Sequence, residues 1–252
     1  MVASSVEPRP LPAPQEHPAA EAAPAAWPRL IVGGAAIFFA LAIILLAVPR
    51  LGSSIELARS KAVYDKLQAN ETGVDDATLE AALASLGRGF GYSADPQLGV
   101  MVAYLHMAQA DRTTDRALAD ARLLKAADAA RATIRVAPSN LIAWVLLAMA
   151  LDSRDPRDPA TLAALARSIH IAPYDPRLLG VRISLAMRHW SQLDEASRKL
   201  AGGQIRRIGE QNLRYLAQVT RDSFGLPAVR EALKDAPALK ARFDSAYLSL
   251  PQ

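Results

Sequence analysis

The chain has 252 residues, with 29 basic and 25 acidic side chains and a formal net charge of +4. It contains no cysteine, which excludes a disulfide framework, a thiolate nucleophile and thiolate metal ligands. Nucleic-acid binding is disfavoured as well, because no recognition motif accompanies the modest charge and aromatic residues make up only 6% of the chain.

The N-terminal 50 residues predict a tail followed by a membrane anchor. Residues 1–29 are rich in Pro and Ala and lack the apolar periodicity that buries a core, so we expect a disordered tail. Residues 30–48 are uncharged and lie between Arg29 and Arg50. At about 1.5 Å per helical residue they reach roughly 30 Å, the thickness of a bilayer's hydrocarbon core. They predict a single transmembrane helix, which we place in a bacterial inner membrane.

A cleaved signal peptide is the main alternative for this apolar segment. The apolar region of such a peptide is usually about 7 to 15 residues long and ends at a small-x-small cleavage site. Here the run is longer, and it is followed by Val48-Pro49-Arg50-Leu51. An uncleaved anchor is therefore the better interpretation.

Residues 54–252 predict an all-α domain, because apolar residues recur at spacings of three and four and no strand pattern occurs. We expect helices over about 54–68, from Asp75 or Asp76 to Leu86, from Asp95-Pro96 to about 110, over 114–136, and from Ser139 or Asn140 to about 153. Gly87 and Gly89 are expected to end the second of these.

Further helix starts follow acidic or amide caps and prolines. Asp158-Pro159 and Asp175-Pro176 each combine an acidic cap with Pro at the first helical position, where its missing N–H costs nothing. The remaining helices are expected after Asp194, near Asn212, and after Pro227 and Pro237.

An internal repeat appears at an offset of 35 residues. Thr133-Ile134-Arg135-Val136-Ala137-Pro138 falls on Ser168-Ile169-His170-Ile171-Ala172-Pro173. The repeat is clearest over residues 114–190 and resembles tetratricopeptide helix pairs. Pro138 is followed at the matching places by Trp144, Leu147, Ala148 and Leu151, and Ala126 matches the small residue of the preceding helix. The match weakens after Pro173, which is followed by Leu179, Arg182 and Ile183.

This resemblance implies a stack of helical hairpins, an α-solenoid, whose concave side holds peptides or partner helices. We expect that binding groove near Trp144, Leu147 and Arg182.

A second resemblance covers more of the chain. The anchor, the helix containing Ser60-Lys61-Ala62-Val63-Tyr64-Asp65, the repeat with Trp144, the segment Ser168 to Tyr174, and Arg182 to Trp190-Ser191-Gln192-Leu193 follow in this order. The layout is similar to that of bitopic helical-repeat accessory proteins of bacterial surface-polysaccharide assembly. It implies a scaffold or accessory role in a cell-envelope complex. Membrane-tethered tetratricopeptide chaperones of cytochrome c maturation are a second similar group and the alternative.

The sequence contains few signals of a catalytic or metal-binding site. His17, His106, His170 and His189 lie far apart and form no metal-ligand spacing, and no nucleotide-binding or nucleophile-elbow motif occurs. We expect no metal, no cofactor and no catalytic residue, and hence no enzyme. A glycan hydrolase is the less favoured alternative. It would need two converging carboxylates, for which Asp152, Asp155, Asp158 and Asp175 are the candidates, although helix capping explains most of them.

Charge indicates one further surface and bears on orientation. Arg207, Arg214 and Arg221 recur every seven residues, so a continuous helix would align them as a basic strip. Such a strip could meet anionic lipids, acidic partners or anionic glycans, although a solvated face is the simpler interpretation.

The basic residues that flank the anchor conflict with the resemblance on orientation. Arg29 precedes the segment, whereas Arg50, Arg59, Lys61 and Lys66 follow it, which by the positive-inside rule places the large domain in the cytoplasm. The rule weakens for large translocated domains, and both the Pro-rich tail and the resemblance favour a periplasmic domain. We expect the periplasmic orientation.

Overall fold

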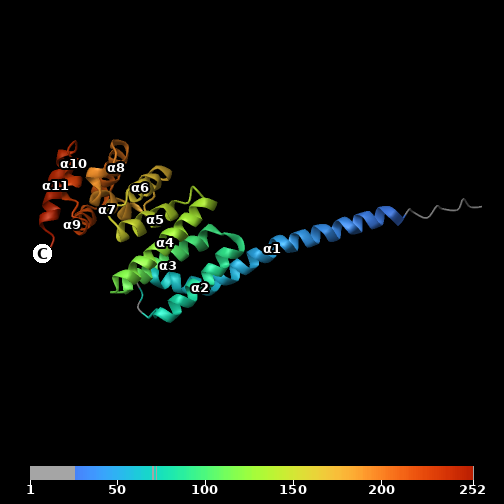
Figure 1. Ribbon diagram of the computed structural model, residues 1–252. Coiled ribbons are helices and arrows are strands. Elements are labelled where there is room, and N and C mark those ends of the chain that lie inside the picture. The colour runs from blue at the N-terminus through green and yellow to red at the C-terminus, as the bar shows by residue number, and fades with distance from the viewer. Residues whose placement is uncertain (1–25, 70, 72, 252) are drawn as a thin grey trace, which may run out of the picture. The chain divides into compact units, whose positions relative to one another are not determined.

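A computed structural model describes residues 26–69, 71 and 73–251. Helices account for most of these residues, and no strand occurs among them (Figure 1). The predicted disordered tail lies outside the described residues up to residue 25, whereas residues 26–29 form the start of the first helix. The chain divides between Leu45 and Leu46 into two units, and the packing described below lies within the second.

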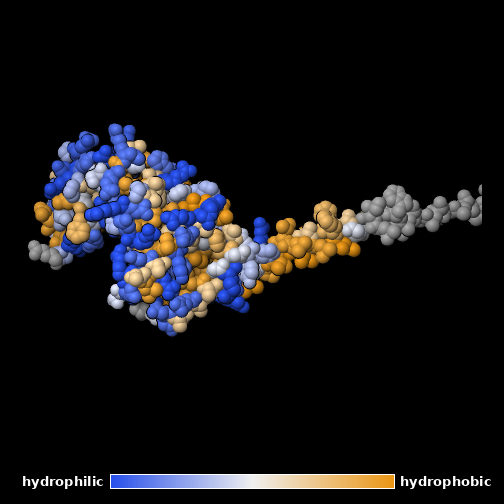
Figure 2. All heavy atoms as spheres, in the orientation of Figure 1, coloured by the Kyte–Doolittle hydropathy of each residue, from blue (hydrophilic) through white to orange (hydrophobic). Residues whose placement is uncertain are grey.

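Helix α1 is continuous over Ala26–Gln68, where the sequence predicted a break between the anchor and a helix starting near residue 54. Pro49 is accommodated inside it, and Ser53 Oγ donates a hydrogen bond to the Pro49 carbonyl at 3.1 Å. Within the described part of the chain, α1 is the one helix long and apolar enough to cross a membrane. Its first part is covered by hydrophobic side chains (Figure 2).

The second half of α1 carries charged residues and packs on α2 through a line of buried polar side chains. Ser53 Oγ donates to the Gly89 carbonyl at 2.8 Å, and Ser60 Oγ donates to the Ala82 carbonyl at 3.2 Å. Between them, Glu56 accepts a short hydrogen bond from the Ser85 hydroxyl and pairs with Arg88 Nη2 at 3.3 Å. Hydrogen bonds as well as apolar contacts therefore fix how these two helices align.

The next helices begin at or near the predicted places. They are α2 (Asp76–Ser93), α3 (Pro96–Arg112), α4 (Arg116–Val136), α5 (Leu141–Arg154) and α6 (Pro159–Ile171). Their N-caps are Asp75, Asp95, Asp115, Asn140 and Asp158, and each side chain accepts a backbone N–H of the first turn. The cap of α4, Asp115, is the one that the sequence analysis did not name.

The prediction that Gly87 and Gly89 end α2 is wrong. The helix continues to Ser93 and ends at Ala94, whose φ is +48°. A Cβ on Gly89 would lie 3.1 Å from both Glu56 Cβ and Leu98 Cδ1. Gly89 therefore does not end α2 but allows α1 and α3 to pack closely against it.

The prediction that Asp175-Pro176 begins a helix is also wrong. Asp175 Oδ1 accepts the Arg177 backbone N–H at 3.0 Å, which closes a turn. The helix α7 (Leu179–Arg188) starts later, after Leu178, and has no side-chain cap.

The C-terminal helices begin near the predicted places. A short 3₁₀ turn, η1 (Trp190–Gln192), precedes α8 (Glu195–Gln211), α9 (Leu213–Asp222), α10 (Leu226–Ala232) and α11 (Pro237–Leu248). Asp194 caps α8 and Asn212 caps α9 through their side chains, as predicted.

Packing follows chain order as far as α6. Each helix from α2 to α6 packs on the next, while α3 also contacts α5, and α5 contacts α7 (Figure 1). Beyond that, α8 contacts α7, α9 and α10, and α11 packs mainly on α9. Separate hydrophobic clusters lie under α1 to α3, within α3 to α8, and within α7 to α11.

The repeated hydroxyl positions are buried at equivalent helix ends. Thr133 near the end of α4 and Ser168 near the end of α6 are fully buried, and each hydroxyl donates to a carbonyl of its own helix. A Cβ on Gly99 would lie only 2.0 Å from Thr133 Oγ1. Gly99 is therefore what allows α3 and α4 to approach at this position.

We expect Gly99→Ala to destabilise the fold by about 2 kcal/mol, because the added methyl group overlaps Thr133 and forces α3 and α4 apart. Gly87→Ala is the control, since Gly87 is a helical glycine with open space around its Cβ position. That change should stabilise by about 0.5 to 1 kcal/mol. Thermal unfolding of the full-length protein in detergent measures both, and equal effects would contradict this role of Gly99.

Glu56 predicts a pH-dependent contribution to stability. The Ser85 hydroxyl first, and then Arg88, lower the pKa of the Glu56 carboxyl from its ordinary value of 4.5. Because the folded-state pKa is lowered, this interaction stabilises the fold above about pH 4.5 and is lost as the pH falls through the lowered value.

Melting temperatures of the wild type and Glu56→Gln between pH 7 and pH 3 test this. The variant should melt lower at pH 7, and the difference between the proteins should shrink as the pH falls below about 4.5. A difference that stays constant down to pH 3 would show that the charge of Glu56 does not stabilise the α1–α2 contact.

Candidate functional site

An apolar groove of about 290 Å³ lies on the face formed by α1, α3, α5 and the start of α7. Its lining residues are Tyr64, Gln68, Tyr104, Met107, Ala108, Asp111, Ile142, Val145, Leu146, Met149, Leu178 and Val181. Ten of these twelve side chains are aliphatic, sulfur-containing or aromatic, a composition typical of sites that bind apolar groups.

Helical periodicity explains why these residues share one face. Tyr104, Met107, Ala108 and Asp111 are spaced at 0, 3, 4 and 7 along α3, and Ile142, Val145, Leu146 and Met149 follow the same spacing along α5. Residues at these intervals form one stripe on a helix. Contacts between α3 and α5 place the two stripes next to each other.

Two tyrosines form one wall of the groove. The rings of Tyr64 and Tyr104 meet edge to face with centroids 5.2 Å apart, and Gln68 Nε2 donates to the Tyr64 hydroxyl at 2.7 Å. Burial raises the pKa of both tyrosine hydroxyls, so they are neutral near pH 7. The wall therefore offers an aromatic surface with neutral hydrogen-bonding groups.

Asp111 lines the groove at the end of α3. Its side chain is exposed, yet the surrounding groups partly desolvate the carboxyl and raise its pKa. Its charge lies close enough to Tyr104 to contribute to the raised pKa of that hydroxyl. A basic group bound in the groove would find a carboxylate there.

The sequence analysis expected a binding groove near Trp144, Leu147 and Arg182. These residues lie on α5 and α7 but do not line the apolar groove. Trp144 is partly buried, and its Nε1 donates to the Pro138 carbonyl at 2.8 Å. Leu147 is buried in the core that joins α3 to α8. α5 and α7 do line the groove, but through the stripes that contain Met149 and Val181. The spacing of three and four along α3 and α5 was the signal that could have identified them.

Arg182 is fully buried rather than presented in a groove. Its Nη1 donates to the Ala172 carbonyl at 2.7 Å, and burial lowers the pKa of its guanidinium. Gln204 Nε2 donates to the neighbouring Pro173 carbonyl at 2.6 Å. Together the two side chains hold the connection between α6 and α7, so their arrangement supports a structural role.

The expected basic strip is divided between two helices. Arg207 belongs to α8, where its guanidinium lies 5.1 Å from the centre of the Tyr174 ring. Arg214 and Arg221 belong to α9, and Arg221 donates to Gln218 and to the Pro251 carbonyl. The continuous helix that would align the three is interrupted at Asn212, which caps α9.

A buried Asp–His pair is the strongest candidate for chemistry. His189 Nε2 lies 2.5 Å from Asp152 Oδ1, and Arg188 Nη2 lies 2.9 Å from Asp152 Oδ2. The other ring nitrogen of His189 is buried and has no hydrogen-bond partner among the described residues. Since Nδ1 is buried and Nε2 is held by Asp152, the pair joins α5 to the end of α7, and neither ring nitrogen is presented to a substrate.

The other three acids considered for hydrolysis have local partners. Asp155 accepts the Arg157 backbone N–H and Asp158 accepts that of Ala160, each at 2.9 Å, while Asp175 pairs with Arg177. Among the described residues, no group of three or more His, Asp or Glu side chains is placed to hold a metal ion.

Comparisons with protein-family models, curated proteins and solved structures found no match to this chain. Within the structure, the groove differs from three other cavities, beside Trp190, Asp152 and Glu80, which are lined mainly by charged and polar side chains. Its apolar lining makes it the candidate binding site.

Proposed function

We propose that this chain is a membrane-anchored interaction protein whose groove between α1, α3, α5 and α7 binds a segment of a partner protein. The observation that carries the proposal is the pair of adjacent apolar stripes on α3 and α5, whose half-buried members, among them Ile142 and Met149, line a groove that no other helix fills. Apolar surface of this kind gains free energy when a partner removes it from water.

The lining chemistry favours an amphipathic helix as the bound segment. Its apolar side chains would contact Met107, Ile142 and Met149, and a Lys or Arg at its edge would face Asp111. Helix-in-groove recognition of this type uses apolar anchors at spacings of three, four and seven. A cavity of about 290 Å³ accommodates the anchoring side chains rather than the whole segment.

The domain is best interpreted as a tetratricopeptide-like stack of helical hairpins. In its support, α2 to α6 pack in chain order, and the matched repeat residues Ala126, Leu147, Ala148 and Leu151 are buried. In addition, α3, α5 and α7 are alternate helices that line one groove, as the first helices of such hairpins would.

We place this function at the bacterial inner membrane, with the domain in the periplasm. The order of anchor, juxtamembrane helix and repeat is similar to that of accessory proteins of surface-polysaccharide assembly, so a scaffold role in such a cell-envelope complex is our proposed setting. The proposed activity is binding rather than catalysis, and its partners are proteins.

Affinity purification after in-cell crosslinking tests the groove. Met149→Glu puts a charge among the apolar lining residues at a half-buried position, and we expect about tenfold less recovery of a specific partner. Leu124→Glu is the matched control, since Leu124 is an exposed leucine of α4 outside the groove lining. Mass spectrometry identifies the partners, and melting temperatures show that both variants fold.

Recovery of polysaccharide polymerase or export components would support the proposed setting. Cytochrome-maturation proteins alone would overturn it, while leaving the groove as the binding site if Met149→Glu removes them. Equal recovery of the partner with both variants would overturn the proposal that the groove binds it.

A further inference from the structure

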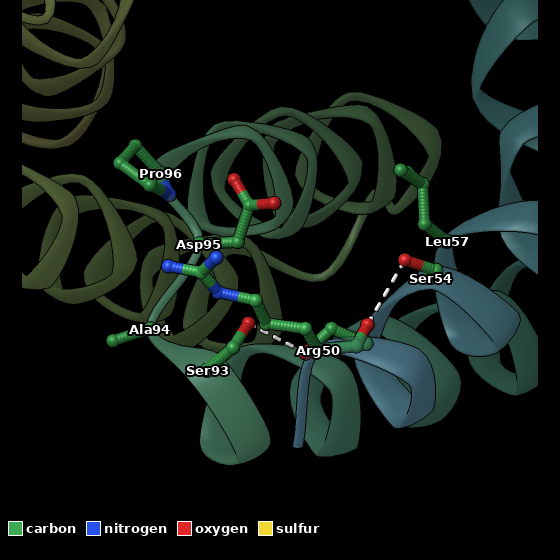
Figure 3. A pocket seen from close by; sticks show the side chains of 8 residues that line it. Arg50, Ser54, Leu57, Ser93, Ala94, Asp95 and Pro96 are labelled. Carbon is green, nitrogen blue, oxygen red and sulfur yellow. Dashed lines mark hydrogen bonds between the residues drawn. The ribbon is translucent and has the colours of Figure 1, made fainter. Parts of the chain in front are cut away.

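A second cavity, of about 380 Å³, lies where α1 meets the connection between α2 and α3. Arg50, Ser53, Ser54 and Leu57 come from α1, and Ser93 and Asp95 come from the connection side (Figure 3). Leu57, Ala94 and Pro96 supply apolar surface, and the rest of the lining carries hydroxyls and two opposite charges. The cavity is large enough for a small polar group rather than a single water.

The two charged side chains lining this cavity are not paired with each other. No ion pair involving Arg50 occurs in the part of the chain that the structure describes, and its side chain is exposed. Asp95 caps α3 by accepting the Gln97 backbone N–H on Oδ1 at 2.8 Å. Its other carboxylate oxygen has no such hydrogen bond among the described residues, so a donor in the cavity could reach it.

Hydroxyl groups lie between these charges. Ser53 Oγ and Ser93 Oγ are 2.6 Å apart and link α1 to α2, and Ser54 Oγ donates to the Arg50 carbonyl at 2.9 Å. Because the Ser54 hydrogen is used on the Arg50 carbonyl, its oxygen is left to accept a hydrogen bond, for example from an ammonium.

Chain position puts Arg50 at the membrane boundary. It follows Val48, the last residue of the apolar segment, by only two residues. The polar headgroup layer of a bilayer is about 5 to 8 Å thick on each side of the hydrocarbon core. A cavity lined by Arg50, Ser53 and Ser54 is therefore within reach of lipid headgroups, whichever side of the membrane the domain occupies.

We propose that this cavity binds the headgroup of a zwitterionic phospholipid with a primary ammonium, namely phosphatidylethanolamine. Arg50 binds the phosphate, the ammonium donates to Asp95, and Leu57 contacts the methylene groups of the ethanolamine. An anionic headgroup without an ammonium leaves Asp95 unpaired near a phosphate. A choline headgroup has no N–H to donate to it.

Native mass spectrometry of the full-length protein, released from nanodiscs with equal amounts of phosphatidylethanolamine, phosphatidylcholine and phosphatidylglycerol, tests the proposal. We expect phosphatidylethanolamine to be retained preferentially. Arg50→Gln should reduce its retention about tenfold, because a charge-assisted contact to the phosphate is lost. Asp95→Asn should abolish the preference over phosphatidylcholine while keeping the α3 cap, since Asn caps helices as well as Asp.

Arg59→Gln is the control, because Arg59 is an exposed arginine of the same helix that does not line the cavity. It should leave retention unchanged. Equal retention of all three lipids, or equal losses in Arg50→Gln and Arg59→Gln, would overturn the proposal. So would displacement of the lipid by inorganic phosphate, because the cavity would then be a site for free phosphate. All of these lipid-retention results are independent of whether the apolar groove binds a partner protein.

Discussion

The buried polar contact between the second half of α1 and α2 is the constraint on which the rest of the domain depends. Ser53, Glu56 and Ser60 are all buried, and each is hydrogen-bonded to α2. A buried polar group that loses its partner is costly, so only the native alignment satisfies all three. The helix that leaves the apolar segment is thereby held against the domain and contributes to both proposed binding sites.

The same alignment determines which α1 residues face each site. Ser53 and Ser54 line the cavity near the membrane boundary, whereas Tyr64 and Gln68, about three turns further along, form the wall of the apolar groove. One helix therefore contributes residues to both the proposed headgroup cavity and the proposed partner groove.

Local rules predicted much of the fold and little of the site. The caps Asp75, Asp95, Asn140 and Asp158 determine helix starts through contacts within one turn, which a sequence pattern captures. Gly89 was wrongly predicted to end a helix, because its role is a contact with Glu56 and Leu98 on two other helices, which a local sequence pattern does not capture. The groove residues were missed because the repeat pattern marks the residues that pack between neighbouring helices, such as Leu147. The groove is lined by the adjacent stripe, whose half-buried members Ile142 and Met149 the repeat pattern does not mark.

The central claim is that the open stripe of α3 and α5 contacts a partner protein. The most direct measurement is in-cell photocrosslinking from a benzophenone amino acid placed at Ala108, a half-buried residue of the groove, and at Ala84, an exposed residue of α2. The account predicts a defined protein adduct from residue 108 and none from residue 84. The same adducts from both positions, or none from residue 108, would contradict it.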